Sequence, residues 1–420
     1  MASFGQLVSV LALGVLSGAS GGCTPGSASD DGDGGSGGSD AATTSSAHVS
    51  SGAGETSASG SVTEGKLGVV VIDVQETFVD GASNPDMPSI IDRTGALFTL
   101  AAEHEVPFFV TFEASQSGDH ALHAPLVPLL PSQASDFIKT TFAATGLSSF
   151  ANAVEAAALT HVVVVGAETD VCVMQTVLGL RAMGLTVLLE QDAVFSEETN
   201  TSPALRRMAQ AGVLLVDQAD VSGYVADQTH LPVGNDAPVR IALPLQTGVV
   251  LTNLTSAGIA ASGDAFKTQK LARLRELLLV SEWFELPVYV EDVAAGLPAE
   301  LEEYFWGQLR PIDQIASDIA VTQLVFAGTD GGIATSVAAW DDGRDVFVME
   351  DALLAQGSSA DQAALLAPLF EQGAVPTTYK SFWYDMTKSV DTAEWPSQAW
   401  VQKLDEYYPI TQAPEDLPPI

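Results

Sequence analysis

The chain has 420 residues and a net charge of −37, because 53 acidic side chains are balanced by only 16 basic ones. Binding to nucleic acid phosphates needs clustered lysine and arginine. The composition therefore excludes nucleic acid as a partner and disfavours direct adhesion to anionic lipid. The length predicts two or three domains, and an apolar fraction of 46% is enough for cores of ordinary size.

The first 23 residues predict an export signal. Apolar residues run from Leu7 to Leu16, a segment too short to cross a bilayer. Small residues at 20–22 precede Cys23, which resembles the lipobox of bacterial lipoproteins, where this cysteine becomes the lipidated N-terminus. Ser20 stands where leucine is usual, and no lysine or arginine precedes Lys66. We expect a cell-envelope lipoprotein on the periplasmic or surface side, attached to the membrane only through Cys23. A signal peptide without lipidation is the alternative.

Residues 24–64 predict a disordered tether. They contain Gly, Ser, Ala, Thr and Asp with almost no large apolar side chain. Such a composition cannot bury enough surface to fold, so we expect this segment to link the anchor to the globular part.

From residue 65 onward, short apolar runs alternate with amphipathic stretches, which is typical of parallel strands joined by crossover helices. The predicted strands are Leu67–Ile72, Pro107–Phe112, Val162–Val165, Thr186–Glu190 and Val213–Val216. The predicted helices are Ile90–Glu103, Val171–Met183 and Pro203–Ala211. The predicted fold class is α/β, a doubly wound, mostly parallel sheet with helices on both faces.

Two reactive side chains follow predicted strands, at the edge where parallel sheets bind ligands. Asp73 follows the first strand, and Cys172 lies in the turn after the third. A thiol at a strand-to-helix turn lies near the positive end of the helix, which stabilises a thiolate. Cys172 is therefore the candidate nucleophile, and a small buried hydrophobic residue is the alternative. With Cys23 lipidated it has no disulfide partner, and this disfavours a redox function.

The same order of segments occurs twice. The matching pairs are Gly68–Asp73 with Gly248–Asn253, Val162–Cys172 with Leu324–Ala334, Val187–Ala193 with Val346–Ala352, and Ala204–Gly212 with Ala363–Gly373. We predict two tandem copies of one α/β domain at residues 65–222 and 241–390. A linker at 223–240 joins them, and a C-terminal tail occupies 391–420.

Three motifs of the first copy stand in order on the predicted elements: VVVIDVQ at 69–75, KTTFAA at 139–144 and GAETDVCVMQT at 166–176. Together they resemble the isochorismatase-like, or cysteine hydrolase, family. The resemblance implies a catalytic triad of Asp73, Lys139 and Cys172, in which the ammonium favours the thiolate and the carboxylate carries the thiol proton. From the residues alone, the alternatives are a solvated surface lysine and a strand-end cap.

The resemblance also implies a cis peptide bond between Ala167 and Glu168, with the backbone N–H groups of Glu168 and Cys172 as the oxyanion hole. It implies a small-molecule substrate and no cofactor. Nicotinamidases of the family carry an Asp-x-His metal motif, whereas residues 111–116 here read TFEASQ. We therefore expect no metal. His120 and His123, beside Asp119, are interpreted as exposed loop residues, with a zinc site as the alternative.

Isochorismatases proper lack the cysteine, so Cys172 disfavours vinyl-ether cleavage. The expected function is hydrolysis of an amide, carbamoyl or related C–N bond, and Glu113 and Glu168 would favour cationic or polar substrates. The alternative is a non-enzymatic, surface-anchored binding or scaffold protein built from two such folds. The motif after Lys139 favours that alternative, because the usual Ser-Ala-Phe is replaced by residues 143–145, Ala-Ala-Thr.

The second copy lacks the triad. Asn253 stands in place of the aspartate, Ala334 in place of the cysteine, and no lysine occurs between Lys270 and Lys380. A fold can persist for packing or partner binding after its site is lost. We expect this copy to be an internal pseudo-dimer partner that caps or shapes the first copy's pocket, with a homo-oligomer as the other arrangement.

Overall fold

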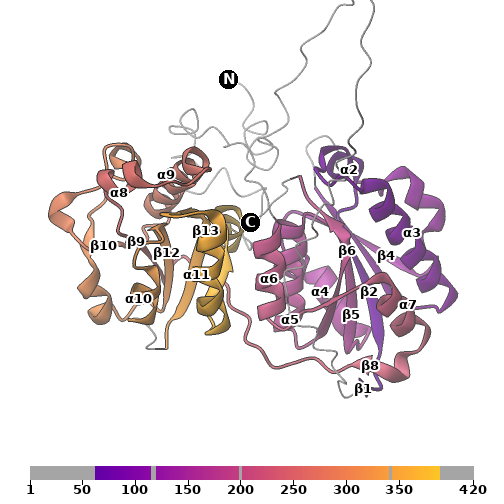
Figure 1. The fold of residues 1–420 in the computed structure, drawn as a ribbon. Coiled ribbons are helices and arrows are strands. Elements are labelled where there is room, and N and C mark those ends of the chain that lie inside the picture. The colour runs from indigo at the N-terminus through magenta and orange to yellow at the C-terminus, as the bar shows by residue number, and fades with distance from the viewer. Residues whose placement is uncertain (1–61, 115–119, 198–200, 340–342, 388–420) are drawn as a thin grey trace, which may run out of the picture.

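Two six-stranded parallel sheets, each with helices on both faces, make up the molecule (Figure 1). The computed structural model describes residues 62–114, 120–197, 201–339 and 343–387. The predicted signal segment 1–23, the tether 24–64 up to residue 61, and the tail 391–420 lie outside the described residues. Within the described ranges, no helix combines the length and the apolar character that a membrane crossing requires.

The first unit is built on a sheet of order β4-β3-β2-β5-β6-β7. Its strands are β2 (Leu67–Ile72), β3 (Phe108–Glu113), β4 (Ala134–Lys139), β5 (His161–Ala167), β6 (Thr186–Phe195) and β7 (Leu214–Val216). Its helices are α2 (Glu76–Gly81), α3 (Met87–Glu103), α4 (Ser148–Ala156), α5 (Met174–Ala182), α6 (Ser202–Gln210) and α7 (Gln218–Ala226). The central strands β2 and β5 are buried along their whole length, and apart from His161 at the start of β5 both consist of apolar residues and glycine rather than alternating polar and apolar ones.

The second unit repeats the design with the order β11-β10-β9-β12-β13-β14. Its strands are β9 (Thr247–Thr252), β10 (Val288–Val290), β11 (Arg310–Pro311), β12 (Gln323–Thr329), β13 (Asp345–Leu354) and β14 (Val375–Thr377). Its helices are α8 (Ser256–Ala261), α9 (Lys267–Trp283), α10 (Ile333–Ala338), α11 (Ser359–Glu371) and α12 (Tyr379–Thr387). The predicted α/β class with two parallel sheets in tandem is confirmed.

Short elements complete the chain. An antiparallel pair joins β1 (Val62–Thr63) to β8 (Leu231–Pro232), so the segment predicted as a plain linker returns to the start of the first unit. A π-helical turn, η3, covers Thr169–Val173. Single 3₁₀ turns cover Ala124–Leu129, Ala144–Gly146, Gln228–His230, Val293–Ala295, Glu302–Tyr304 and Ile312–Ser317.

The two units share unusual backbone conformations at equivalent positions. The residue after the first strand of each sheet is left-handed, with φ of 49° at Asp73 and 45° at Asn253. Gly166 and Gly328 also have positive φ, 122° and 113°, and the register shifts beside each of them. A Cβ on Gly166 would lie 2.0 Å from the Ile72 carbonyl oxygen, so only glycine fits there.

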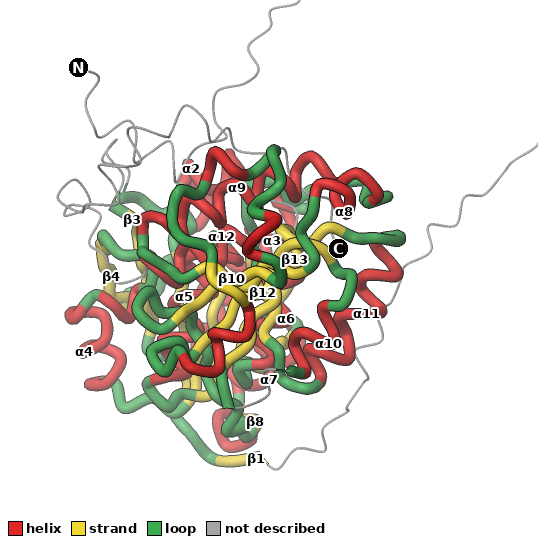
Figure 2. The backbone as a smooth tube through the Cα atoms, turned by 90° about the vertical axis from the view of Figure 1, so that its left-hand side faces the viewer, coloured by secondary structure: helices red, strands yellow, loops and turns green. Residues whose placement is uncertain are grey.

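The two units contact each other through unlike faces. One hydrophobic core joins the α4–α5–α6 side of the first sheet to the α9–α12 side of the second. Separate cores fill the α3–α7 side of the first sheet and the α10–α11 side of the second. Figure 2 shows α9 and α12 on one side of the second sheet and α10 and α11 on the other. By chain order α9 and α12 correspond to α3 and α7, so this contact is heterologous rather than two-fold.

Candidate active site

Asp73 lies directly beyond β2, at the carboxyl edge of the first sheet. Its side chain is fully buried, and the Thr111 hydroxyl donates to Asp73 Oδ1 at 2.8 Å. Because β2 is a central strand, the carboxylate is enclosed by the neighbouring strands. The backbone at Asp73 is left-handed, which ends the strand and turns the chain toward α2.

Lys139 ends β4 and is also fully buried. Its Nζ lies 2.6 Å from Asp73 Oδ2 and donates to Cys172 Sγ at 3.3 Å. The residues predicted as a triad are therefore brought together, with the ammonium between the carboxylate and the sulfur. A buried ion pair of this kind is costly to break from one side, because the remaining charge is left without a partner.

Cys172 lies within η3, between β5 and α5, and is 1% exposed. The predicted helix Val171–Met183 is observed as two helical segments, because its first residues belong to the π-helical turn and α5 begins at Met174. The Glu168 carbonyl accepts from Val171 N and from Val173 N, and the latter i→i+5 bond makes the turn π-helical. The peptide bond between Ala167 and Glu168 is cis, as the resemblance implied.

Glu113 is the group that the sequence did not place at the centre. It ends β3 and pairs in register with Lys139 on β4. Its Oε2 lies 3.6 Å from Cys172 Sγ and 3.9 Å from Lys139 Nζ. The sequence could have indicated Glu113 only through its position at the end of a predicted strand, because no motif includes it.

The electrostatics of the cluster differ from the sequence expectation. Burial raises the pKa of the Cys172 thiol well above its ordinary value; Lys139 lowers this pKa, whereas the Asp73 and Glu113 carboxylates raise it further. Burial alone would lower the pKa of Lys139, but Asp73, Cys172 and Glu113 raise it above its usual range. Burial also raises the pKa of Glu113. These directions favour a lysine ammonium and a protonated Cys172 thiol, and Lys139 acts on the thiol in the expected sense, toward the thiolate.

Asp73, Glu113 and Cys172 also form the one cluster of three metal-ligand types found among the described residues. The Lys139 ammonium already lies against Asp73, where a cation would be held, so these residues do not fit a metal site. His123 pairs through Nδ1 with Glu76. His120 is partly buried, and Asp119 lies outside the described residues.

The equivalent edge of the second sheet has different chemistry. Asn253 is exposed, and its backbone N–H donates to the Glu291 carboxylate. Ala334 lies in α10, at the position that corresponds to Cys172 of the first unit.

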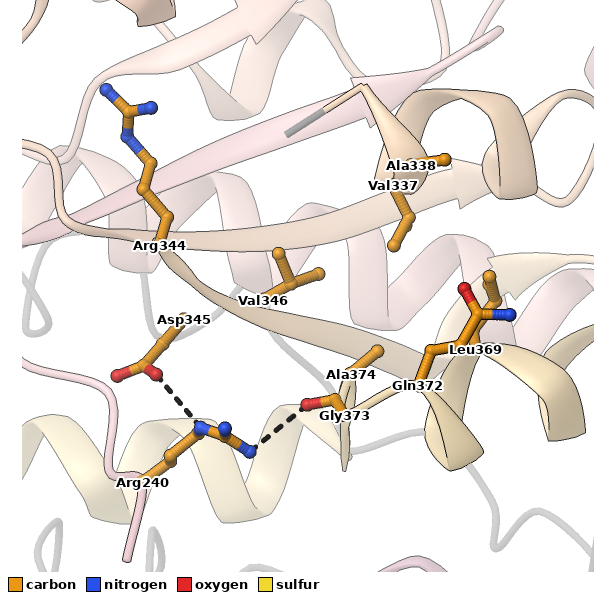
Figure 3. Close-up of a pocket in the computed structure, with 10 residues that line it drawn as sticks. All are labelled: Arg240, Val337, Ala338, Arg344, Asp345, Val346, Leu369, Gln372, Gly373 and Ala374. Carbon is orange, nitrogen blue, oxygen red and sulfur yellow. Dashed lines mark hydrogen bonds and ion pairs between the residues drawn. The ribbon is translucent and has the colours of Figure 1, made fainter. Parts of the chain in front are cut away.

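The pocket in Figure 3, about 160 Å³, lies at the opposite edge of the second sheet, beside the start of β13 and the end of α11. Arg240 crosses it, pairing with Asp345 at 3.0 Å and donating to the Gly373 carbonyl. That pocket is remote from the cysteine.

The first unit as a whole matches a known domain. Residues 68–220 match the family model of the isochorismatase domain. No curated protein matches the chain.

The isochorismatase domain is similar in structure to solved proteins over about two fifths of this chain. The MAR1 ribonuclease of Caenorhabditis elegans is 28% identical, with 40% of this chain and 86% of that chain covered and a TM-score of 0.36. The YcaC gene product of Escherichia coli, described as an octameric hydrolase of unknown specificity, is 23% identical, with 39% and 82% covered and a TM-score of 0.36. YcaC from Pseudomonas aeruginosa, solved with hexane-2,5-diol and covalent acrylamide, is 20% identical, with 39% and 83% covered and a TM-score of 0.34.

Proposed function

We propose that this protein is a cysteine hydrolase that cleaves an amide, carbamoyl or related C–N bond of a small molecule. The observation that carries the proposal is the buried Lys139 ammonium, 2.6 Å from the Asp73 carboxylate and 3.3 Å from the Cys172 sulfur. A nucleophile, a proton carrier and a fixed cation within direct reach of one another match the requirements of nucleophilic acyl transfer.

In the proposed reaction, Cys172 Sγ attacks the carbonyl carbon while its proton passes to Asp73. The C–N bond then breaks, the proton returns to the leaving nitrogen, and a thioester remains on the enzyme. Water attacks the thioester, Asp73 takes up its proton, and the acid product leaves with the thiol restored. The backbone N–H groups of Glu168 and Cys172 are proposed to hold the developing oxyanion.

A Cys172 thiol that is protonated before substrate binds is consistent with proton transfer to Asp73 during the attack. Burial raises the thiol pKa, so we expect deprotonation to accompany attack rather than precede it. Lys139 stabilises the sulfur's negative charge as it develops, and Asp73 and Glu113 both lie within 4.8 Å of the sulfur through one oxygen each. Asp73 is therefore close enough to take up the thiol proton.

The test is hydrolysis by the full chain across a panel of primary amides and ureido compounds, with release of ammonia or amine as the signal. Cys172→Ala is expected to abolish turnover, and Cys172→Ser to reduce it by at least about 10³-fold. Asn253→Ala, at the position of the second unit that corresponds to Asp73, is the control and should keep wild-type turnover. Mass spectrometry of the quenched reaction should detect an acyl adduct on Cys172.

Turnover that survives in Cys172→Ala would contradict the cysteine mechanism. Binding of panel compounds without turnover or adduct would instead favour the non-enzymatic binding protein.

We also propose export and lipidation at Cys23, from the apolar segment 7–16 and the small residues before the cysteine. Metabolic labelling with palmitate in a bacterial host should mark the wild type and not Cys23→Ser. Equal labelling of both, or of neither, would contradict lipidation.

A further inference from the structure

Helix α12, the last described element of the second unit, lies against the turn of the first unit that carries Cys172. Lys380 and Tyr384, one helical turn apart, both contact the first unit. Ser381 and Asp385, again one turn apart, contact it as well. Trp383 instead packs against Trp283 and Phe284 of its own unit. One face of α12 therefore belongs to the second unit's core and the other to the active-site turn.

Lys380 makes the contact closest to the proposed chemistry. Its Nζ lies 2.8 Å from Glu168 Oε2 and 3.6 Å from Asp170 Oδ2. Both carboxylates are largely buried, with 10% and 2% of their side chains exposed. They flank the backbone that leads into Cys172, and each also has a partner within the first unit: Glu197 N for Glu168 and the Ser196 hydroxyl for Asp170.

Two further contacts hold α12 in this place. The Tyr384 ring packs edge-on against Phe142, three residues beyond Lys139, with centroids 4.4 Å apart. Asp385 is fully enclosed and accepts from Gln175 at 2.7 Å and from Arg207 at 2.6 Å. The helix is thereby fixed to α5 and α6 as well as to η3, so the Lys380 ammonium has a defined position.

The repeat shows that these side chains are not needed to build the helix. α7 is the counterpart of α12, because each follows the last strand of its sheet. At the positions of Lys380 and Tyr384, α7 carries Ala219 and Gly223. α7 packs beside α3 and leaves most of its surface exposed. The cation and the aromatic ring are therefore features of the helix that contacts the other unit's site.

We propose that the second unit completes the active site of the first, with Lys380 as a positioning residue for the Glu168–Cys172 turn. Lys380 neutralises two enclosed carboxylates on the segment whose N–H groups are assigned to the oxyanion. Without this cation, Glu168 and Asp170 repel each other and the turn loses the geometry that aims the N–H groups. This inference rests on the proposed function only for its catalytic consequence; the positioning itself is a property of the fold.

The experiment compares Lys380→Met, which removes the charge and keeps the length, with Lys380→Arg, which keeps the charge. Arg206→Met is the matched control. Arg206 pairs with Glu350 across the same interface, with both oxygens at 2.7 Å, and its ion pair involves neither Glu168 nor Asp170. Amide hydrogen exchange of the peptide covering 166–176 is one readout, and kcat and KM on a substrate of the wild type are the other.

Loss of a charge-assisted hydrogen bond at a buried site corresponds to a change of about 10–100-fold. Lys380→Met should speed exchange in 166–176 by at least about tenfold and lower kcat by a similar factor, with KM changed less. Lys380→Arg should keep both the exchange rate and kcat close to their wild-type values. Arg206→Met should leave exchange in 166–176 unchanged even if global stability falls.

Equal exchange in wild type and Lys380→Met, or equal acceleration in Arg206→Met, would overturn the inference. A wild type that hydrolyses nothing, while Lys380→Met still loosens the turn, would instead reject the proposed function and leave the positioning role intact.

Discussion

At the scale of single residues, the site is organised around a cation that keeps two carboxylates and a thiol together. Lys139 pairs directly with Asp73 and lowers the pKa of Cys172, but burial of the thiol raises that pKa by more. The sequence supported a nucleophile at this position but not its protonation state, because that depends on burial and on Glu113. Neither follows from the spacing of the motifs.

Removing the carboxylate should therefore separate thiol reactivity from catalysis. In Asp73→Asn, the field that raises the Cys172 pKa is lost while Lys139 remains. Alkylation by iodoacetamide at pH 8 should be faster than in the wild type, because the pKa of the thiol falls, although hydrolysis is abolished. The measurement uses a Cys23→Ser background with Asn253→Asp as control. Slower alkylation than the wild type would show that Asp73 is needed to ionise the resting thiol.

Glu190 is a buried titratable residue remote from this chemistry. It lies on β6, and neither carboxylate oxygen has a hydrogen-bond partner within the described part of the chain. Burial raises its pKa from 4.5 to about 7, and Asp192 adds to the shift. Its counterpart in the second unit is Met349, which shows that the fold accepts an apolar residue there.

The raised pKa makes stability fall as pH increases from about 4.5 to about 7, because the folded state then holds a proton that the unfolded state has released. Above that window the loss is constant, at about 1–3 kcal/mol. Glu190→Gln should therefore be more stable than the wild type at pH 8, with the difference shrinking toward pH 5. Denaturant unfolding at several pH values measures this, and a difference independent of pH would contradict it.

At the scale of elements, apolar runs predicted the buried strands well and the edge strand poorly. The bounds of β2 were predicted as observed, and β3, β5, β6 and β7 differ mainly at their ends. β4 was missed because half of it faces outward and its sequence, Ala-Ser-Asp-Phe-Ile-Lys, has no apolar run. Lys139 stands on that strand, so its placement in the site came from the family resemblance rather than from periodicity.

Strand β5 requires a glycine at position 166, and a substitution can test this requirement. An alanine there combines positive φ with a Cβ 2.0 Å from the Ile72 carbonyl oxygen, whereas Gly184, with φ of 88°, has no atom within 4 Å of its would-be Cβ. Gly184→Ala should cost only the conformational penalty of about 1 kcal/mol. Gly166→Ala should cost more than about 3 kcal/mol, because backbone must move. Equal unfolding midpoints for the two variants would contradict the close approach.

At the scale of the whole molecule, one core continues from the first unit into the second. The sequence predicted two copies of one fold, but their arrangement depends on side chains that meet only after both have folded. Arg207, for example, lies on α6 and is 1% exposed because Asp385 of α12 encloses it. No repeat pattern in the sequence contains that information.

A shared core predicts that the units unfold together. All six tryptophans lie at or beyond Trp283, so their fluorescence reports on the second half of the chain. Pulse labelling of Cys172 reports on the first unit, in a Cys23→Ser background. The two midpoints in urea should coincide in the wild type. Two separate midpoints would show that the units are independently stable.

The heterologous contact gives the two units different surroundings. A two-fold pair would give each unit the same neighbour. Here a helix of the second unit reaches the first unit's turn, while Asn253 at the second unit's own edge stays open to solvent. In this geometry α12 of the second unit supplies contacts to the first unit's turn, and those contacts require none of the three side chains that are missing at the second unit's own edge.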